Sequence, residues 1–218
     1  GAGKTTLFNV ISGFMSPTAG KVFYGGKDIT MLSPYKKAGM GIVRTFQLSN
    51  LFMYVSVLEN VSMALHLHSD VPYLGSALAT RSARSNEAKH IERARELMRF
   101  WGLQELENQI AATLPHGLQR YLGIAIAVAT EPKLLMLDEP ATGLNEKEQA
   151  FIMEKLQQVR SRGTTIILVE HDMGVVMNIS DRIVVLNFGK KIADGSPLEI
   201  RQNPDVVEAY LGTRHGIA

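Results

Sequence analysis

The sequence predicts an α/β fold in which helices cover a mainly parallel sheet. Short apolar runs, such as residues 134–137 and 165–169, have the length and composition of strands that are buried on both faces. Segments with the apolar spacing of helices separate these runs, and such alternation is typical of parallel sheets. The chain has 218 residues, of which 45% are hydrophobic, so it can bury a sizeable core in one or two domains.

The elements near the start of the chain follow from apolar spacing and turn residues. A helix is predicted over residues 5–12, because its apolar residues fall on one face, and Gly13 ends it. Strands are predicted over residues 21–24 and 41–46. Glycines and a proline in the polar segment between these strands predict turns there.

Residues 57–114 change to a mainly helical pattern. Within them, the apolar residues of 91–101 recur at helical spacing among acids and bases, which predicts an amphipathic helix ended by Gly102. The charges of this helix alternate in sign instead of forming a one-sign block. We therefore interpret them as a solvated face and predict no nucleic-acid partner.

Strands and helices alternate again in the C-terminal half. The helix predicted over residues 118–130 is apolar nearly all round, so we expect it to be buried. Asn145 and Glu148 have the spacing of a capping box that opens the next helix. Strands are predicted over residues 165–169, as a buried strand, and over 183–186.

The chain opens with residues typical of a phosphate-binding loop, in which glycine N–H groups wrap phosphates and a lysine reaches them. These residues are Gly1, Ala2, Gly3, Lys4, Thr5 and Thr6. The full pattern needs a further glycine upstream of Gly3. We therefore expect the chain to begin within the loop, after the strand that normally precedes such a loop.

Asp138 and Glu139 follow the apolar run of residues 134–137. Parallel sheets bind ligands at the carboxyl ends of their strands. At such an end Asp138 can reach a magnesium ion, and Glu139 can orient an attacking water. Together with the phosphate loop, these carboxylates predict ATP hydrolysis, with ATP and Mg²⁺ as the cofactors.

The composition argues against several other kinds of site. A net charge of +2 gives no reason to expect nucleic acid, and without cysteine there is neither a disulfide framework nor a thiolate metal site. The longest apolar stretch, residues 122–129, is far shorter than the roughly 20 residues that cross a bilayer. We predict neither a transmembrane segment nor a metal site formed by protein ligands alone.

At this point the order of motifs resembles that of the ATP-binding subunits of ABC transporters, over essentially the whole chain. The matching segments are residues 1–6 (Walker A), Gln47 (Q-loop), 114–120 (signature), Asp138 and Glu139 (Walker B and catalytic glutamate), 142–145 (D-loop) and His171 (switch histidine). The resemblance implies a RecA-like P-loop NTPase core formed by residues 1–50 and 115–218, with a mainly helical subdomain of residues 51–114 inserted into it.

The resemblance also implies a role for each motif residue. The implied catalytic residues are Glu139, His171 and Gln47, and the implied magnesium ligands are Thr5, Gln47 and Asp138. The implied nucleotide contacts are Gly1, Ala2, Gly3, Lys4, Thr5 and Thr6, together with Pro115, His116, Gly117 and Gln119 of the signature.

The signature departs from the common Leu-Ser-Gly-Gly-Gln pattern of this family. Pro115 stands where the serine is usual, His116 replaces a glycine, and Leu118 replaces a glutamine. In the family this segment contacts the nucleotide of the opposite subunit through helix N-terminal amides and the serine hydroxyl. Loss of such a donor costs roughly 10²–10³ in rate, which would lower turnover unless His116 supplies a replacement.

Further stretches resemble the ATPases of branched-chain amino acid importers, chiefly the tail of residues 203–212, together with residues 44–47, 51–52 with 57–61, 143–145 and 169–173. This implies transmembrane permease subunits, a second ATPase cassette that is identical or different, and, indirectly, a periplasmic or extracellular substrate-binding protein. The chain would then be peripheral, on the cytoplasmic face of the plasma membrane. Import of urea or short-chain amides stays open, as does, less strongly, a soluble ABC ATPase without a transport role.

Apolar and aromatic residues gather just after Gln47, among them Leu51, Phe52 and Tyr54. Their composition suits an interface with a membrane partner. It suits packing beneath the helical subdomain equally well, so the sequence leaves both interpretations open.

Overall fold

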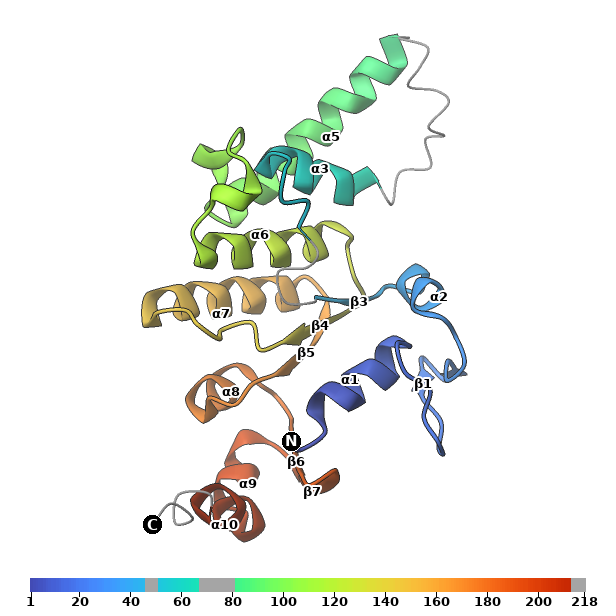
Figure 1. Ribbon diagram of the computed structural model, residues 1–218, viewed down its shortest axis with the longest axis vertical. Helices are drawn as coiled ribbons and strands as arrows, with labels where there is room; N and C mark the ends of the chain where they lie inside the picture. Colours follow the sequence, from blue (N-terminus) through green and yellow to red (C-terminus); the bar gives the residue numbers. More distant parts are fainter. Residues whose placement is uncertain (46–50, 67–80, 213–218) are drawn as a thin grey trace. The chain divides into compact units, whose positions relative to one another are not determined.

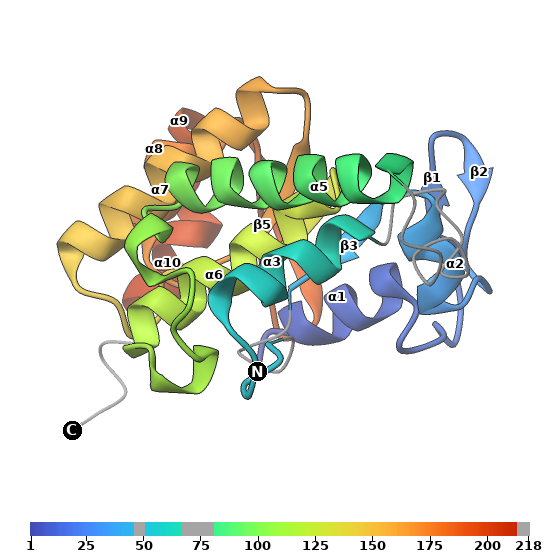
Figure 2. The same cartoon turned by 90° about the horizontal axis from the view of Figure 1, so that it is seen from above.

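The computed structural model describes residues 1–45, 51–66 and 81–212 (Figures 1 and 2). The chain divides into two compact units, one formed by Gly1–Lys37 with Val169–Ala218 and the other by Ala38–Leu168. We describe each unit by itself and call them the terminal unit and the middle unit. The division into a core and an inserted helical subdomain has other boundaries and stays a prediction.

The middle unit contains a sheet with the strand order β3-β4-β5. β3 (Ile42–Arg44) and β4 (Leu134–Asp138) pair in parallel, with Ile42 opposite Leu134. β5 (Thr165–Val169) lies on the other side of β4. β4 is therefore central, and all of it except Asp138 is buried. The predicted α/β fold with a parallel sheet is confirmed.

The strand β5 differs from the prediction of a buried strand. Its exposure alternates along the chain, and Ile167 is 37% exposed, whereas Val169 is buried. Like β3, β5 is an edge strand of the described sheet and has a neighbouring strand on one side only, whereas β4 has one on each side. The apolar composition predicted the strand correctly but not its position at the edge.

Helices of the middle unit lie in successive layers beside the sheet, as Figure 1 shows. α6 (His116–Ala129) contacts both α7 (Glu146–Ser161) and α3 (Val57–His66), and α3 also contacts α5 (Arg81–Phe100). Short 3₁₀ turns, η1 (Gln104–Leu106) and η2 (Ala111–Thr113), lead from α5 back to α6. α6 is buried along most of its length, as its apolar composition predicts.

Local sequence signals set the ends of two of these helices. α5 is amphipathic as predicted, since Ala94 and Met98 are buried while Arg93 pairs with Glu96 at 2.9 Å on the exposed face. It ends just before Gly102, whose φ of +68° is left-handed. At the start of α7, Asn145 and Glu148 form the predicted capping box.

The terminal unit combines the two ends of the chain. Its elements are α1 (Lys4–Ser12), β1 (Phe23–Tyr24), β2 (Lys27–Asp28), α2 (Pro34–Gly39), α8 (Met173–Ile179), β6 (Ile183–Asn187), β7 (Lys190–Gly195), α9 (Pro197–Gln202) and α10 (Pro204–Gly212), and the unit boundary falls within α2, after Lys37. β1 pairs with β2, and β6 with β7, in antiparallel hairpins. Ile183, Ala193, Ile200 and Val206 form an apolar cluster between β6, β7, α9 and α10.

A buried lysine fixes the far end of α1. The Lys37 ammonium donates hydrogen bonds to the carbonyls of Val10 at 3.2 Å and Ile11 at 2.9 Å. These are carbonyls of the last helical turn, which a cation satisfies well. Burial lowers the pKa of Lys37. Gly13 ends the helix in the left-handed region, and a Cβ there would lie 2.8 Å from the Leu32 carbonyl oxygen.

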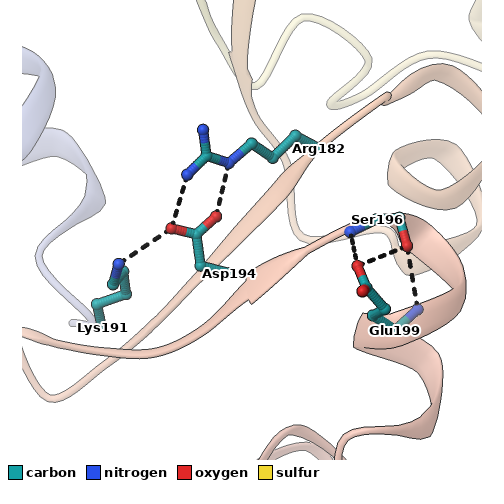
Figure 3. A network of polar contacts seen from close by, with 5 residues as sticks. All are labelled: Arg182, Lys191, Asp194, Ser196 and Glu199. Carbon is teal, nitrogen blue, oxygen red and sulfur yellow. Dashed lines mark hydrogen bonds and ion pairs between the residues drawn. The ribbon is translucent and has the colours of Figure 1, made fainter.

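Asp194 on β7 joins an ion-pair network in the β6–β7 hairpin (Figure 3). Its carboxylate accepts hydrogen bonds from the Arg182 guanidinium at 2.7 and 3.0 Å and from the Lys191 ammonium at 3.0 Å. These contacts, with those of Arg182 the larger cause, lower the pKa of Asp194 to about 2. Next to it, Ser196 and Glu199 form a capping box that opens α9.

This network makes the stability of the hairpin depend on pH. The folded pKa of Asp194 lies below its value of roughly 3.9 in an unfolded chain, so its stabilisation is present above pH 4 and is lost as the pH falls through 2. We expect Asp194→Asn to lower the midpoint of urea unfolding at pH 6. Below pH 4 the midpoint of this variant should fall less with decreasing pH than that of the wild type. Urea unfolding followed by circular dichroism measures this, with Arg182→Gln expected to behave alike. A wild-type profile in both variants would contradict it.

Candidate nucleotide site

The phosphate loop leads into α1 through a left-handed glycine. Gly3 is the N-cap of α1 with a φ of +90°, and its carbonyl accepts the N–H of Leu7 at 3.0 Å. No side chain caps this helix end, and the first turn carries no acidic residue. The first N–H groups of α1 and the positive end of its dipole are therefore open to an anion. Lys4 is half-buried here, while Thr5 and Thr6 are exposed.

The turn between β6 and β7 contacts this loop. The N–H of Gly189 donates to the carbonyl of Ala2 at 3.2 Å, and a Cβ on Gly3 would lie 3.7 Å from the Gly189 Cα. The hairpin thus contacts the loop at Ala2 and Gly3. The sequence offered no signal for this contact, because it joins residues that are far apart in the chain.

Asp138 ends β4, and its carboxylate is held by an arginine of the neighbouring strand. The Arg44 guanidinium donates to Asp138 Oδ2 at 3.0 Å, and both side chains are largely buried. The N–H of Thr45 donates to the Met136 carbonyl at 2.9 Å, which continues the pairing of β3 with β4 beyond Arg44. A small pocket of about 20 Å³, lined by Thr45, Gln119 and Asp138 among others, has room for about one water.

Glu139 has an unusual backbone conformation for a residue with a side chain. Its φ of +49° is in the left-handed region, which costs about 1–2 kcal/mol outside glycine. The conformation turns the chain sharply after β4, and the N–H of Thr142 donates to the Glu139 carbonyl at 3.3 Å. The Thr142 hydroxyl also donates to Glu139 Oε2 at 3.3 Å. Backbone strain of this kind is concentrated at functional sites.

The signature segment packs against the start of α7 in the middle unit. Pro115 is the N-cap of α6, and Pro115 and His116 are exposed, whereas Gly117 is buried. A Cβ on Gly117 would lie 2.6 Å from Glu148 Oε1, so a side chain at this position would require the Glu148 carboxylate to move. His116 lies near the turn before α7, with its Cε1 3.7 Å from where a Cβ of Gly143 would be.

The Gln119 side chain is turned inward. It is buried, and its amide donates to the carbonyls of Ala111 at 3.2 Å and Ala112 at 3.4 Å in η2. In this structure Gln119 therefore anchors α6 to the preceding 3₁₀ turn. Its predicted nucleotide contact stays a prediction.

His171 lies in the terminal unit, two residues beyond Val169, the last residue of β5. It is exposed, and the next residue, Asp172, is the N-cap of α8. Asp172 Oδ1 accepts the N–H groups of Gly174 at 2.8 Å and Val175 at 3.2 Å. This cap fixes the backbone that follows His171. An aspartate directly before a helical segment is a sequence signal for an N-cap, so this cap could have been predicted from the sequence.

Each unit thus contains part of the predicted set. The middle unit brings Asp138 and Glu139 together and places the signature against the start of α7. Lys4, Thr5 and His171 belong to the terminal unit. Gln47 lies outside the described residues. The structure adds Arg44 and Thr142, which the motif pattern did not single out as contacts of Asp138 and Glu139.

Family comparison decides the class of this site. The model of the ABC transporter family matches residues 1–142, which is more than half of the chain. The chain belongs to the ABC transporter family of ATP-binding cassettes. A second model, described as branched-chain amino acid ATP-binding cassette transporter, matches residues 190–216 of this cassette.

Named relatives lie in the same branch. The cassette is 45% identical to the high-affinity branched-chain amino acid transport ATP-binding protein BraF of Pseudomonas aeruginosa, over 97% of this chain and 84% of BraF. It is 44% identical, with the same coverage, to the protein LivG of Escherichia coli, which carries the same description. The family, the ATPase class and the branched-chain amino acid branch predicted from the sequence are confirmed.

A solved structure supports the fold of the cassette. The ADP conformation of MJ1267, an ATP-binding cassette of an ABC transporter, matches with a TM-score of 0.80 and 31% identity, over 97% of this chain and 84% of that one. Within the described part of the cassette, no helix combines the length and the apolar character that crossing a membrane requires.

Proposed function

We propose that this cassette binds ATP with Mg²⁺, hydrolyses the β–γ phosphoanhydride, and thereby powers import of branched-chain amino acids through membrane permease subunits. One observation carries the ATPase proposal: Asp138 and Glu139 emerge together from the central buried strand β4, with Glu139 held in a strained backbone conformation. The substrate class rests on the branch to which the cassette belongs.

The phosphate loop would hold the nucleotide. The uncapped N–H groups at the start of α1 provide hydrogen bonds to phosphate oxygens, and the glycines before them let the backbone approach closely. Lys4 adds a positive charge on a flexible stem that can reach the β- and γ-phosphates. Lys37 supports this arrangement indirectly, because it anchors the opposite end of α1.

The residues available for Mg²⁺ fit that ion. Mg²⁺ prefers oxygen ligands and is commonly bound by a carboxylate or two together with substrate phosphates. Thr5 offers a hydroxyl and Asp138 a carboxylate, and Gln47 would add an amide oxygen. The described residues contain no group of three or more His, Asp or Glu side chains that could hold a metal ion, so in this proposal the nucleotide supplies much of the coordination. When bound, Mg²⁺ would neutralise charge on the phosphates.

Glu139 would act on the attacking water. Its carboxylate orients the water and accepts a proton as the water oxygen bonds to the γ-phosphorus and the bond to the ADP oxygen breaks. Thr142, which donates to Glu139 Oε2, would hold this carboxylate in one orientation. His171 would donate a hydrogen bond to the γ-phosphate, and Gln47 would contact the water or the metal.

A second cassette would complete each site. In this proposal the signature of one cassette contacts the nucleotide bound by the other through the N-terminal amides of α6, with His116 as an additional donor. Pro115 and His116 are exposed at that helix end and are therefore accessible to a partner. The second cassette is a copy of this chain or a different ATPase of the same family.

The segment after Gln47 would transmit closure to the permease. Asn60, which is buried, accepts the N–H of Phe52 at 2.9 Å and donates to its carbonyl at 3.0 Å, so the turn of residues 52–56 is firmly held. This turn leaves Phe52 58% and Tyr54 90% exposed, while Leu51 packs inward. A fixed turn with two exposed aromatic side chains suits an interface anchor. We therefore favour contact with the membrane partner over packing beneath the helices.

Through this contact the cassette would be peripheral, on the cytoplasmic face of the membrane, where it meets ATP. A periplasmic or extracellular binding protein would deliver the amino acid to the permease on the other side. The cassette itself would make no contact with the transported substrate.

Reconstitution tests the proposal. In proteoliposomes that contain the permease, both cassettes and the binding protein, we expect leucine to stimulate ATP hydrolysis and urea to leave it unchanged. Tyr54→Ala should reduce the leucine-stimulated rate, because it removes an exposed anchor of the coupling turn. Tyr35→Ala is the matched control, since Tyr35 is a similarly exposed tyrosine outside that turn.

The outcomes separate the alternatives. Stimulation by urea alone would overturn the amino acid assignment and leave the ATPase in place. Failure to copurify with permease subunits would favour a soluble ABC ATPase. Equal effects of the Tyr54 and Tyr35 substitutions would contradict the assignment of residues 52–56 to the coupling interface.

A further inference from the structure

The ion pair between Arg44 and Asp138 follows from the strand register. Arg44 lies opposite Met136 in the parallel pair of β3 and β4. Asp138 is two residues beyond Met136 on β4, so its side chain projects from the same face of the sheet as those of Met136 and Arg44. The guanidinium donates to Asp138 Oδ2 at 3.0 Å, and the side chains are only 6% and 17% exposed.

A pair this buried has electrostatic consequences. Solvent screens buried charges much less than exposed ones, so the Arg44 charge offsets much of the Asp138 charge locally. Breaking such a pair by removing one partner leaves an uncompensated buried charge. The contact uses one carboxylate oxygen, Oδ2, and a carboxylate has further lone pairs on both oxygens for other ligands.

We propose that Arg44 is a positioning residue that serves as the resident counter-ion of Asp138 and sets how strongly nucleotide binding depends on Mg²⁺. This rests on the proposed function, in which Asp138 acts on the metal bound to the nucleotide. Arg44 holds the carboxylate by Oδ2 and leaves Oδ1 to the metal or its water shell. It also weakens the repulsion between Asp138 and the phosphates when no metal is present.

The sign of the effect follows from Coulomb's law. Without the Arg44 charge, Asp138 repels the metal-free nucleotide more strongly and attracts Mg²⁺ more strongly. The affinity for metal-free nucleotide should fall, while the affinity for the magnesium complex should fall less or rise. The ratio of the affinity for the magnesium complex to the affinity for the metal-free nucleotide therefore increases. A general loss of structure would instead weaken the binding of both nucleotide forms alike.

The test measures the dissociation constants of a non-hydrolysable ATP analogue with a β,γ-imido bridge, in EDTA and in Mg²⁺, by isothermal titration calorimetry. We expect Arg44→Gln to raise the Mg²⁺-dependent ratio of affinities about tenfold, in line with the size of nearby-charge effects on ionisable groups. Arg44→Lys keeps the charge and should keep the ratio within about twofold of the wild type. Arg95→Gln is the matched control, because Arg95 pairs with Glu107 at 3.0 Å in the same unit.

The outcomes separate the inference from the function on which it rests. Asp138→Asn should lower the ratio, and the Arg44→Gln, Asp138→Asn double variant should match Asp138→Asn alone, because Arg44 acts through Asp138. An unchanged ratio in Asp138→Asn would overturn the proposed metal role of Asp138. A lowered ratio there, with an unchanged or reduced ratio in Arg44→Gln, would overturn only the role of Arg44. If Arg44→Gln does not fold, a tenfold change in Arg44→Lys would also overturn it.

Discussion

Replacing Glu139 by glutamine is expected to abolish most ATP hydrolysis while ATP binding is retained. The amide has nearly the same shape as the carboxylate but cannot accept the proton of the attacking water. General-base catalysis contributes roughly 10²–10⁴ to such rates, so we expect a loss of that size in the steady-state ATPase rate of the assembled transporter. Nucleotide affinity, measured separately by equilibrium titration, should change by less than about threefold, because the substitution removes no phosphate contact.

Glu131→Gln provides a closely matched control for this experiment. Glu131 also has a left-handed backbone, with a φ of +46° against +49° for Glu139, and its side chain is exposed. The two variants therefore make the same chemical change in the same backbone conformation. A similar loss of hydrolysis in both would point to a backbone effect, and wild-type hydrolysis in Glu139→Gln would assign the water to another residue.

Replacing Lys4 by alanine is expected to weaken nucleotide binding itself. The ammonium would make charge-assisted hydrogen bonds to phosphate, and a hydrogen bond to a charged group contributes about 1.5–3 kcal/mol. The dissociation constant for ATP should rise roughly 10- to 100-fold, since about 1.4 kcal/mol corresponds to a factor of ten. Fluorescence titration with a labelled nucleotide measures this directly.

Lys36→Ala is the control for the lost positive charge, because Lys36 is exposed on α2 of the same unit. It should leave the affinity near that of the wild type. Equal losses in the two variants would indicate a long-range effect of net charge instead of a contact between Lys4 and phosphate.

The sequence predicted those features that depend on neighbouring residues. The apolar run of β4, the capping box of Asn145 and the glycine end of α5 are local signals, and each lies where it was expected. The order of motifs predicted the family in the same way, because each motif is a short segment with its own chemistry.

What the sequence could not predict depends on contacts between distant segments. The edge position of β5 depends on which strands pair, and the Arg44–Asp138 contact depends on the register between β3 and β4. The inward turn of Gln119 depends on carbonyls in η2, which compete for its amide. A single sequence contains no direct signal for such pairings, since many registers satisfy the same apolar pattern.

The packing around Gly117 has a consequence for how the signature can vary. A side chain at this position would displace the Glu148 carboxylate, whose other oxygen accepts the N–H of Asn145 at 3.0 Å to open α7. Pro115 and His116 are exposed and carry no comparable restriction within the chain. Mutation can therefore exchange the first residues of the motif, as in this cassette, without disturbing contacts inside the subunit, whereas a replacement of the glycine must move Glu148 and so weaken the capping box that opens α7.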